Sequence, residues 1–232
     1  IDPDKTAKLV AKLFEKGLVT YPRTDSVNLS DEAVAEVRKQ AEANDWPLPD
    51  QPRRFKAKGD AQEAHEAIRP THFEDRTAGD TAEEKALYEL IWARSVACQL
   101  ADAEYKTNKL VLTGDSNGQT FQFAAKSQLL VAPGWKTLTA KDAVNEDDSN
   151  EDEAGNVPQL AEGSSVAADS GEVVSKQTKP PSRYTQASLV AKLEAEGVGR
   201  PSTYPAIMQN ILGKRYLVQE KRQLKPSAEG CE

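Results

Sequence analysis

The sequence has 232 residues, enough for one or two domains with a sizeable hydrophobic core. Its net charge is −7, which at first sight argues against a polyanionic ligand. The sequence shows no signal peptide and no run of about 18 apolar residues, which argues against a membrane protein. Met208 is the only methionine, so we expect Ile1 to lie inside a longer natural chain.

Charge is unevenly distributed along the chain. Segment 142–172 holds 10 acidic residues and no basic one, which leaves 27 acidic residues against all 30 lysines and arginines elsewhere. The acidic residues lack ordered ligand spacing and indicate a solvated loop, and Cys98 and Cys231 are expected to be reduced thiols. The sequence therefore predicts no metal site, and its net charge does not exclude DNA as a ligand.

Helices dominate the first hundred residues. Asp2 as N-cap predicts a helix that ends at Gly17, with an apolar stripe of Leu9, Val10, Leu13 and Phe14. A short extended piece over 18–21 follows, and Ser30 predicts a second helix running to about residue 43.

Two more helices are expected before residue 104. Residues 60–68 predict a short helix ended by Arg69 and Pro70, which would place His65 and Arg69 on one helix face. Thr81 predicts a capped helix running to about residue 100, with an apolar face of Leu87, Leu90, Ile91 and Cys98.

The rest of the chain is predicted to be rich in strands first and helical afterwards. From residue 104 the pattern alternates, predicting strands over 105–113 and 120–124 around an Asn117-Gly118 turn, and one or two short strands over 164–176. After 181, two short helices separated by the turn 197–201 and followed by a hairpin are typical of a winged helix, a common DNA-binding arrangement.

Tyr21 is the candidate nucleophile. It ends an apolar run, and Pro22 forces the backbone to turn immediately after it. A tyrosine hydroxyl attacks well only as phenolate, so it needs cationic neighbours, and Arg23 offers a permanent charge with a donor fork suited to phosphate. This pattern predicts covalent attack on a phosphodiester.

Other residues are candidates for holding the DNA backbone. His65 would hydrogen-bond a phosphate oxygen or help to position the scissile group. Arg69 and Arg200 are predicted phosphate contacts, the latter assisted by Ser202 and Thr203 at a helix N-terminus.

Three strings carry a resemblance to a known family. Residues 20–26 (TYPRTDS), 64–71 (AHEAIRPT) and 197–204 (GVGRPSTY) resemble, in the same order, three signatures of the type IA DNA topoisomerases. Pro22 is more like topoisomerase III, whereas the following VNLS (27–30) looks more like bacterial topoisomerase I, which we favour.

The resemblance implies an α+β, multidomain fragment. Its expected parts are a helical domain with the active-site tyrosine (1–103), a β-rich arch segment (104–180) completed by upstream sequence, and the start of a helical DNA-binding gate domain (181–232). It also implies single-stranded DNA as substrate, a 5′-phosphotyrosyl intermediate without ATP, and a bacterial cytoplasmic, nucleoid-associated protein. Mg²⁺ would bind the full-length enzyme in an upstream Toprim-containing half, with no ligands in this chain.

Three interpretations remain open from the sequence alone. The chain is either part of a cleaving enzyme or a non-catalytic DNA-binding module that uses only its winged-helix-like end. A scaffold domain that has lost activity is the third reading. As an isolated fragment, the chain is expected to be inactive in relaxing DNA.

Overall fold

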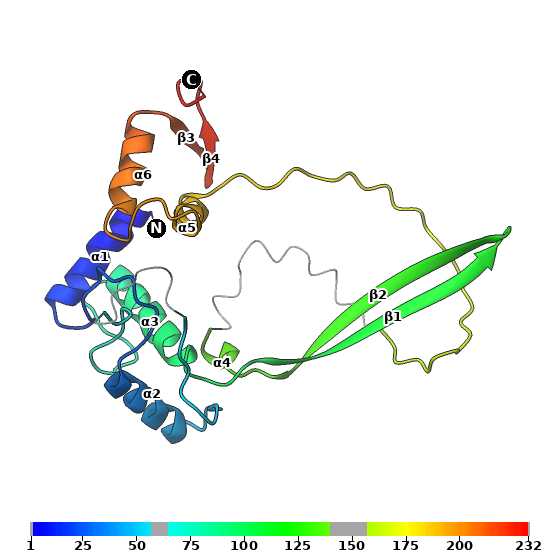
Figure 1. The fold of residues 1–232 in the computed structure, drawn as a ribbon, viewed down its shortest axis with the longest axis horizontal. Coiled ribbons are helices and arrows are strands. Elements are labelled where there is room, and N and C mark those ends of the chain that lie inside the picture. The colour runs from blue at the N-terminus through cyan, green and yellow to red at the C-terminus, as the bar shows by residue number, and fades with distance from the viewer. Residues whose placement is uncertain (1, 57–64, 140–156, 232) are drawn as a thin grey trace.

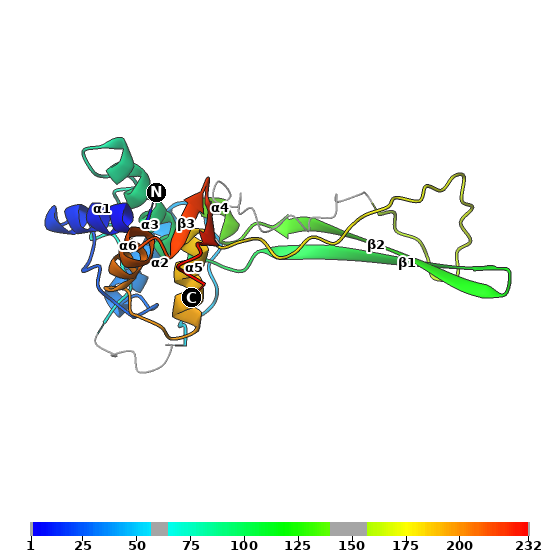
Figure 2. The same cartoon turned by 90° about the horizontal axis from the view of Figure 1, so that it is seen from above.

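The structure, a computed structural model, describes residues 2–56, 65–139 and 157–231. A helical body carries a long two-stranded hairpin that projects away from it, and the C-terminal helices return to the body (Figures 1 and 2). The described elements are, in chain order, α1 (Pro3–Glu15), α2 (Asp31–Ala43), α3 (Ala82–Ala97), β1 (Glu104–Ser116), β2 (Gln119–Ala132), α4 (Lys136–Thr139), α5 (Gln186–Ala195), α6 (Tyr204–Gly213), β3 (Leu217–Glu220) and β4 (Gln223–Pro226). None of the described helices is long and apolar enough to cross a membrane.

Side-chain caps fix the starts of four helices, as the sequence predicts. The side chain of each capping residue accepts a hydrogen bond from the backbone N–H three residues later. The distances are 2.7 Å for Asp2, 3.3 Å for Ser30, and 3.1 Å for both Thr81 and Thr185. Each bond satisfies an N–H that the first helical turn leaves unpaired. After α1, Gly17 adopts a left-handed φ of +70°, the conformation that ends many helices.

The core lies where α1, α2 and α3 meet. α1 contributes Leu13 and α2 contributes Val37, both fully buried, while Tyr88, Trp92 and Val96 of α3 fill the space between. The predicted apolar face of α3 is wrong in part, because Leu90 is 42% exposed and the deepest face is one position further along. Phe14 of α1 is likewise exposed, at 40%, and does not join the core.

The hairpin β1–β2 is longer than predicted. Its antiparallel register runs without interruption from Tyr105, opposite Leu130, to Ser116, opposite Gln119, and closes at Asn117 and Gly118, which both adopt positive φ. Apolar side chains on it are exposed, among them Phe123 at 70% and Leu129 at 67%. The strands predicted over 164–176 are wrong: described residues 157–185 form no strand, and the acidic segment's 142–156 part lies outside the described residues.

The helix predicted over 60–68 is also not found where it can be checked. Residues 60–64 lie outside the described part, and 65–69 are not helical. Backbone groups of Arg69 and Ala67 bond instead to Thr20 and Asn28, which lie on either side of Tyr21, and such long-range pairing overrides local helix preference.

The C-terminal elements form the predicted helix–turn–helix–hairpin unit. α6 lies against α1, with Met208 buried at 2% exposure, and β3 pairs with β4. The chain before α5 joins this unit, because the Leu224 N–H donates to the Tyr184 carbonyl at 2.7 Å.

Glu84 predicts how the stability of the body depends on pH. Its carboxylate accepts Lys16 Nζ at 2.6 Å and the Asp80 N–H at 2.9 Å, and these bonds lower the pKa of Glu84 to about 2. A lowered pKa stabilises the fold above the ordinary glutamate value, and this stabilisation is lost as pH falls from there toward 2. Glu84→Gln should therefore destabilise the protein at pH 7 and much less at pH 3, measured by urea unfolding. Glu89→Gln, at an exposed glutamate of α3, should show no such pH-dependent difference.

Candidate active site

The segment that presents Tyr21 is paired with a segment far along the chain. Val19 forms an antiparallel bridge with Pro70. The Thr20 N–H donates to the Arg69 carbonyl at 2.9 Å, and the Thr71 N–H donates to the Leu18 carbonyl at 3.1 Å. The first two motifs are therefore held side by side by backbone hydrogen bonds.

Thr20 strengthens this pairing with its side chain. Its hydroxyl accepts the Arg69 N–H at 3.0 Å and donates to the Ala67 carbonyl at 3.2 Å. Further on, the Ala67 N–H donates to the Asn28 carbonyl at 2.7 Å. The loop between residues 20 and 28 is thus anchored at both ends against one segment, residues 67–69.

Tyr21 lies immediately after the anchored pair and is 55% exposed. Its ring meets Phe14 of α1 edge to face, with centroids 5.4 Å apart and ring planes at 72°. This is a favourable aromatic arrangement. The phenol is therefore accessible to a large partner while its ring is held from one side.

A small pocket next to Tyr21 gathers predicted residues from all three motifs. Its volume is about 140 Å³, and its lining is Arg23, Thr24, Asp25, His65, Arg200, Pro201 and Ser202. Two guanidinium groups, an imidazole, two hydroxyls and the carboxylate of Asp25 therefore surround one space of a size suited to a phosphate group. Tyr21 itself is not part of the lining, but it precedes Arg23 by two residues.

His65 has a carboxylate partner in this pocket. Its Nδ1 lies 3.1 Å from Asp25 Oδ1, and both side chains are partly exposed. A carboxylate on one ring nitrogen orients the imidazole and directs the other nitrogen outward.

Arg69 and Thr203 have other contacts in this structure. Arg69 Nε donates to Glu66 Oε2 at 2.9 Å, and its side chain is only 13% exposed. Burial raises the pKa of Glu66, but the bonds from Arg69 and Ser30 outweigh it and leave that pKa below the ordinary value. The Thr203 hydroxyl accepts the Arg200 N–H at 2.8 Å, so it shapes the turn that carries Arg200.

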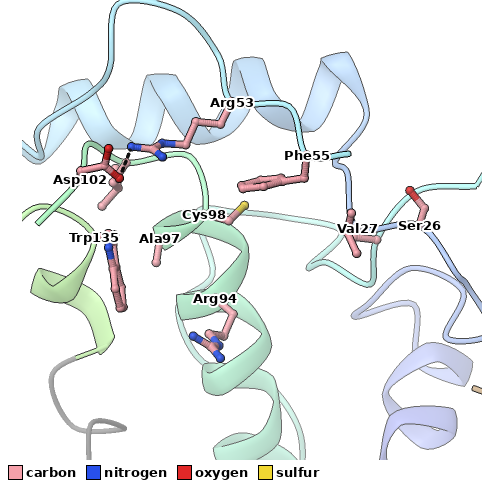
Figure 3. A pocket seen from close by; sticks show the side chains of 11 residues that line it. Ser26, Val27, Arg53, Phe55, Arg94, Ala97, Cys98, Asp102 and Trp135 are labelled. Carbon is pink, nitrogen blue, oxygen red and sulfur yellow. Dashed lines mark ion pairs between the residues drawn. The ribbon is translucent and has the colours of Figure 1, made fainter. Parts of the chain in front are cut away.

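A larger cavity of about 650 Å³ lies between α3, the loop around Arg53 and the base of the hairpin (Figure 3). Its walls include Phe55, Cys98 and Trp135, and burial raises the pKa of the Cys98 thiol. Arg53 pairs there with Asp102 at 2.8 Å. None of the predicted site residues lines this cavity, so chemistry rather than size favours the smaller pocket.

The residues that the structure describes do not fit a metal site. They contain no group of three or more histidine, cysteine, aspartate or glutamate side chains placed to hold an ion. Among the described residues, Asp25 and His65 are not joined by a third side chain of these types.

Sequence reasoning missed three contributors to this site. Asp25 lies within the first motif, and its spacing from Tyr21 gave no hint that it would contact His65. Thr20 and Phe14 act through contacts with Ala67 and with the Tyr21 ring. A threonine next to a nucleophile and an aromatic residue at the end of a helix are too common to be singled out from sequence.

Comparison with known proteins now assigns the class. The profile of the DNA topoisomerase family matches residues 1–232, and the chain belongs to this family, among the bacterial type IA enzymes. It is 43% identical over 233 residues to the plasmid DNA topoisomerase I of Xylella fastidiosa, covering 99% of this chain and 35% of that protein. It is 40% identical to DNA topoisomerase 1 of Streptomyces coelicolor, covering 96% of this chain and 24% of that protein.

A solved structure supports the fold. The chain is similar to full-length topoisomerase I from Thermotoga maritima, with a TM-score of 0.64 and 28% identity over 92% of this chain and 33% of that one. The chain therefore spans about a third or less of the lengths of these relatives.

Proposed function

We propose that the protein to which this chain belongs relaxes negatively supercoiled DNA without ATP. It cuts a single strand through Tyr21, passes another strand through the break and reseals it. We place it at the nucleoid of the bacterial cytoplasm, because DNA is its proposed substrate. The observation that carries the proposal is the pocket beside Tyr21, where Arg23, His65 and Arg200 meet.

The chemistry is an exchange of one ester for another. Tyr21 Oη attacks the phosphorus, its proton leaves, and the new bond joins the phenol oxygen to the 5′ phosphate. The bond from phosphorus to the 3′ oxygen breaks, and that oxygen takes up a proton. Because an ester replaces an ester, the 3′ hydroxyl can attack in reverse and restore the strand without ATP.

The pocket residues serve the phosphoryl group during this exchange. Arg23 and Arg200 stabilise the negative charge that develops on the non-bridging oxygens, since donors already in place cost no reorganisation. His65, oriented by Asp25, donates to a phosphate oxygen from its second ring nitrogen. Ser202 adds a neutral donor, and Arg69 remains a predicted phosphate contact that would first have to leave Glu66.

Two partners of the chain are part of the proposal. The exposed apolar side chains of β1–β2 support an upstream, Toprim-containing half of the same protein as the element that completes the arch. The family resemblance implies Mg²⁺ in that half. Since the described residues of this chain do not fit a metal site, we derive no step through the ion.

His65 and Asp25 give a graded prediction for the cleavage step. Removing one donor that stabilises a transition state costs about 10²–10³-fold in rate, so His65→Ala should slow adduct formation by that factor. Asp25→Asn should slow it less, because His65 keeps its ring but loses its anionic partner. Single-turnover trapping on a labelled single strand measures both rates. Asp50→Asn, at an exposed aspartate outside the pocket, should react as fast as the wild type.

The linking number of plasmid DNA tests the proposed function. A full-length protein containing this chain, given one negatively supercoiled topoisomer and Mg²⁺ without ATP, should yield products separated by steps of one. This follows because one strand passes through a break in one strand. Steps of two, or a requirement for ATP, would contradict the proposal. The 232-residue chain alone should leave the topoisomer unchanged.

A further inference from the structure

Besides the small pocket and the larger cavity, a groove lies at the C-terminal unit, between the chain entering α5 and the β3–β4 turn. Its volume is about 950 Å³, and residues 182–185, 187, 188 and 220–223 line it. We call it the wing groove. The described residues that line it differ from those that line the pocket beside Tyr21.

Hydrogen bonds hold the two walls of the wing groove together. The Leu224 N–H donates to the Tyr184 carbonyl at 2.7 Å, which places the entering chain alongside β4. Gln186 Nε2 donates to Gln219 Oε1 at 2.6 Å and ties the start of α5 to β3. The groove is therefore built by tertiary contacts between two segments and is not a gap beside one loose loop.

The lining is basic although the whole chain is acidic. Arg183 comes from one wall and Lys221 and Arg222 come from the other. Among the described lining residues, the one acidic side chain is Glu220, which is in an ion pair with Lys225. Cations on both sides of a groove, with the acid already paired, favour a polyanion that runs between them.

An aromatic side chain lies among these cations. Tyr184 is 47% exposed, although its backbone carbonyl is fixed by Leu224. An exposed aromatic ring on a fixed backbone, next to arginine and lysine, is the combination with which proteins bind single-stranded nucleic acid: the cations follow the phosphates and a base stacks on the ring.

We propose that the wing groove binds single-stranded DNA, with a base on Tyr184 and phosphates at Arg183 and Lys221. The choice of DNA as the polyanion rests on the proposed function. The choice of a single strand rests on Tyr184, because a paired and stacked base has no face to offer a side chain. The groove thus holds nucleotides other than those at the phosphodiester that Tyr21 attacks.

Substitutions at Tyr184 test the stacking. The full chain is titrated with a labelled oligonucleotide, single-stranded in one series and duplex in the other. Tyr184→Leu should weaken single-strand binding roughly tenfold or more, the usual effect of losing one stacked base. Tyr184→Phe should restore it, since the ring remains. A Tyr184→Leu protein that binds the single strand like the wild type, or that loses duplex binding equally, would overturn the proposal.

Salt dependence tests the phosphate contacts. Each phosphate contact to a single strand contributes about 0.7 to the slope of log affinity against log salt, so Arg183→Ala with Lys221→Ala should reduce that slope by about 1.4. The matched control is Lys192→Ala, a lysine of α5 that pairs with Glu196 outside the groove, and it should leave the slope unchanged. An unchanged slope in the double variant would contradict the assignment.

The outcome is separable from that of the proposed function. The groove variants, joined to the upstream half and given saturating DNA, should still form the covalent adduct, and Tyr21→Phe should still bind through the groove. If Tyr21→Phe loses the adduct while Tyr184→Leu leaves binding unchanged, only the proposal about the wing groove is contradicted. If the wild type binds single-stranded DNA through the groove but forms no adduct, only the proposed function is contradicted.

Discussion

Tyr21→Phe in the full-length protein is expected to abolish relaxation and adduct formation. Phenylalanine keeps the ring and its contact with Phe14 but removes the only atom that can form the ester. Removal of a catalytic nucleophile costs on the order of 10⁶-fold in other enzymes, which would bring the activity to background. Plasmid relaxation and trapping on labelled single strands provide the two measurements.

Two companion results keep this prediction specific. Single-strand binding by Tyr21→Phe should match the wild type, because the pocket cations remain. Tyr216→Phe, at another exposed tyrosine, should relax DNA normally. Adduct formation that persists in Tyr21→Phe would show that another residue attacks the DNA.

Trp92→Ala is expected to cause the largest loss of stability. Trp92 is 5% exposed, lies 6.1 Å from the Trp46 ring, and donates from Nε1 to the Phe73 carbonyl at 2.9 Å. Truncating a buried aromatic residue leaves a cavity and costs about 3–5 kcal/mol. The change should also loosen the active site, because Phe73 follows closely on Pro70, the residue that pairs with Val19.

Urea unfolding measures this loss, and two variants bracket it. Trp92→Phe keeps most of the volume but leaves the Phe73 carbonyl without its partner, so it should cost about 1–3 kcal/mol. Leu90→Ala, on the exposed side of α3, should stay within about 0.5 kcal/mol of the wild type. A Trp92→Ala protein as stable as Leu90→Ala would contradict the core described above.

Local signals in the sequence predicted the helix ends well. Asp2, Ser30, Thr81 and Thr185 act on neighbours within one helical turn, so their pattern is visible without knowledge of the rest of the fold. The Asn117-Gly118 turn is local in the same sense, since both residues tolerate positive φ.

Long-range pairing explains what the sequence did not reveal. Residues 65–69 look helical in isolation, but their backbone groups bond to Thr20 and Asn28. The burial of α3 is set by which side faces the core, and this moves the buried face by one position, from Leu87 and Ile91 to Tyr88 and Trp92. Strand length in β1–β2 depends on the partner strand and not on alternation alone.

The candidate site likewise combines features that local sequence reveals with features that only the fold reveals. The motifs supplied Tyr21, Arg23, His65 and Arg200 as candidates, each within its own string. That Arg200 shares a pocket with Arg23, and that Asp25 contacts His65, follows only from the fold.

Mapping the attachment site on the protein is the most direct test of Tyr21 as the nucleophile. The full-length protein is trapped on single-stranded DNA labelled at either end, and the label that stays on the protein is measured first. A second portion is then digested with nuclease and protease, and the nucleotide-bearing peptide is sequenced by mass spectrometry. We expect the nucleotide on Tyr21, with the 3′-end label retained on the protein and the 5′-end label released, because the ester joins the 5′ phosphate of the downstream strand. A nucleotide on any other residue, or retention of the 5′-end label, would contradict the account.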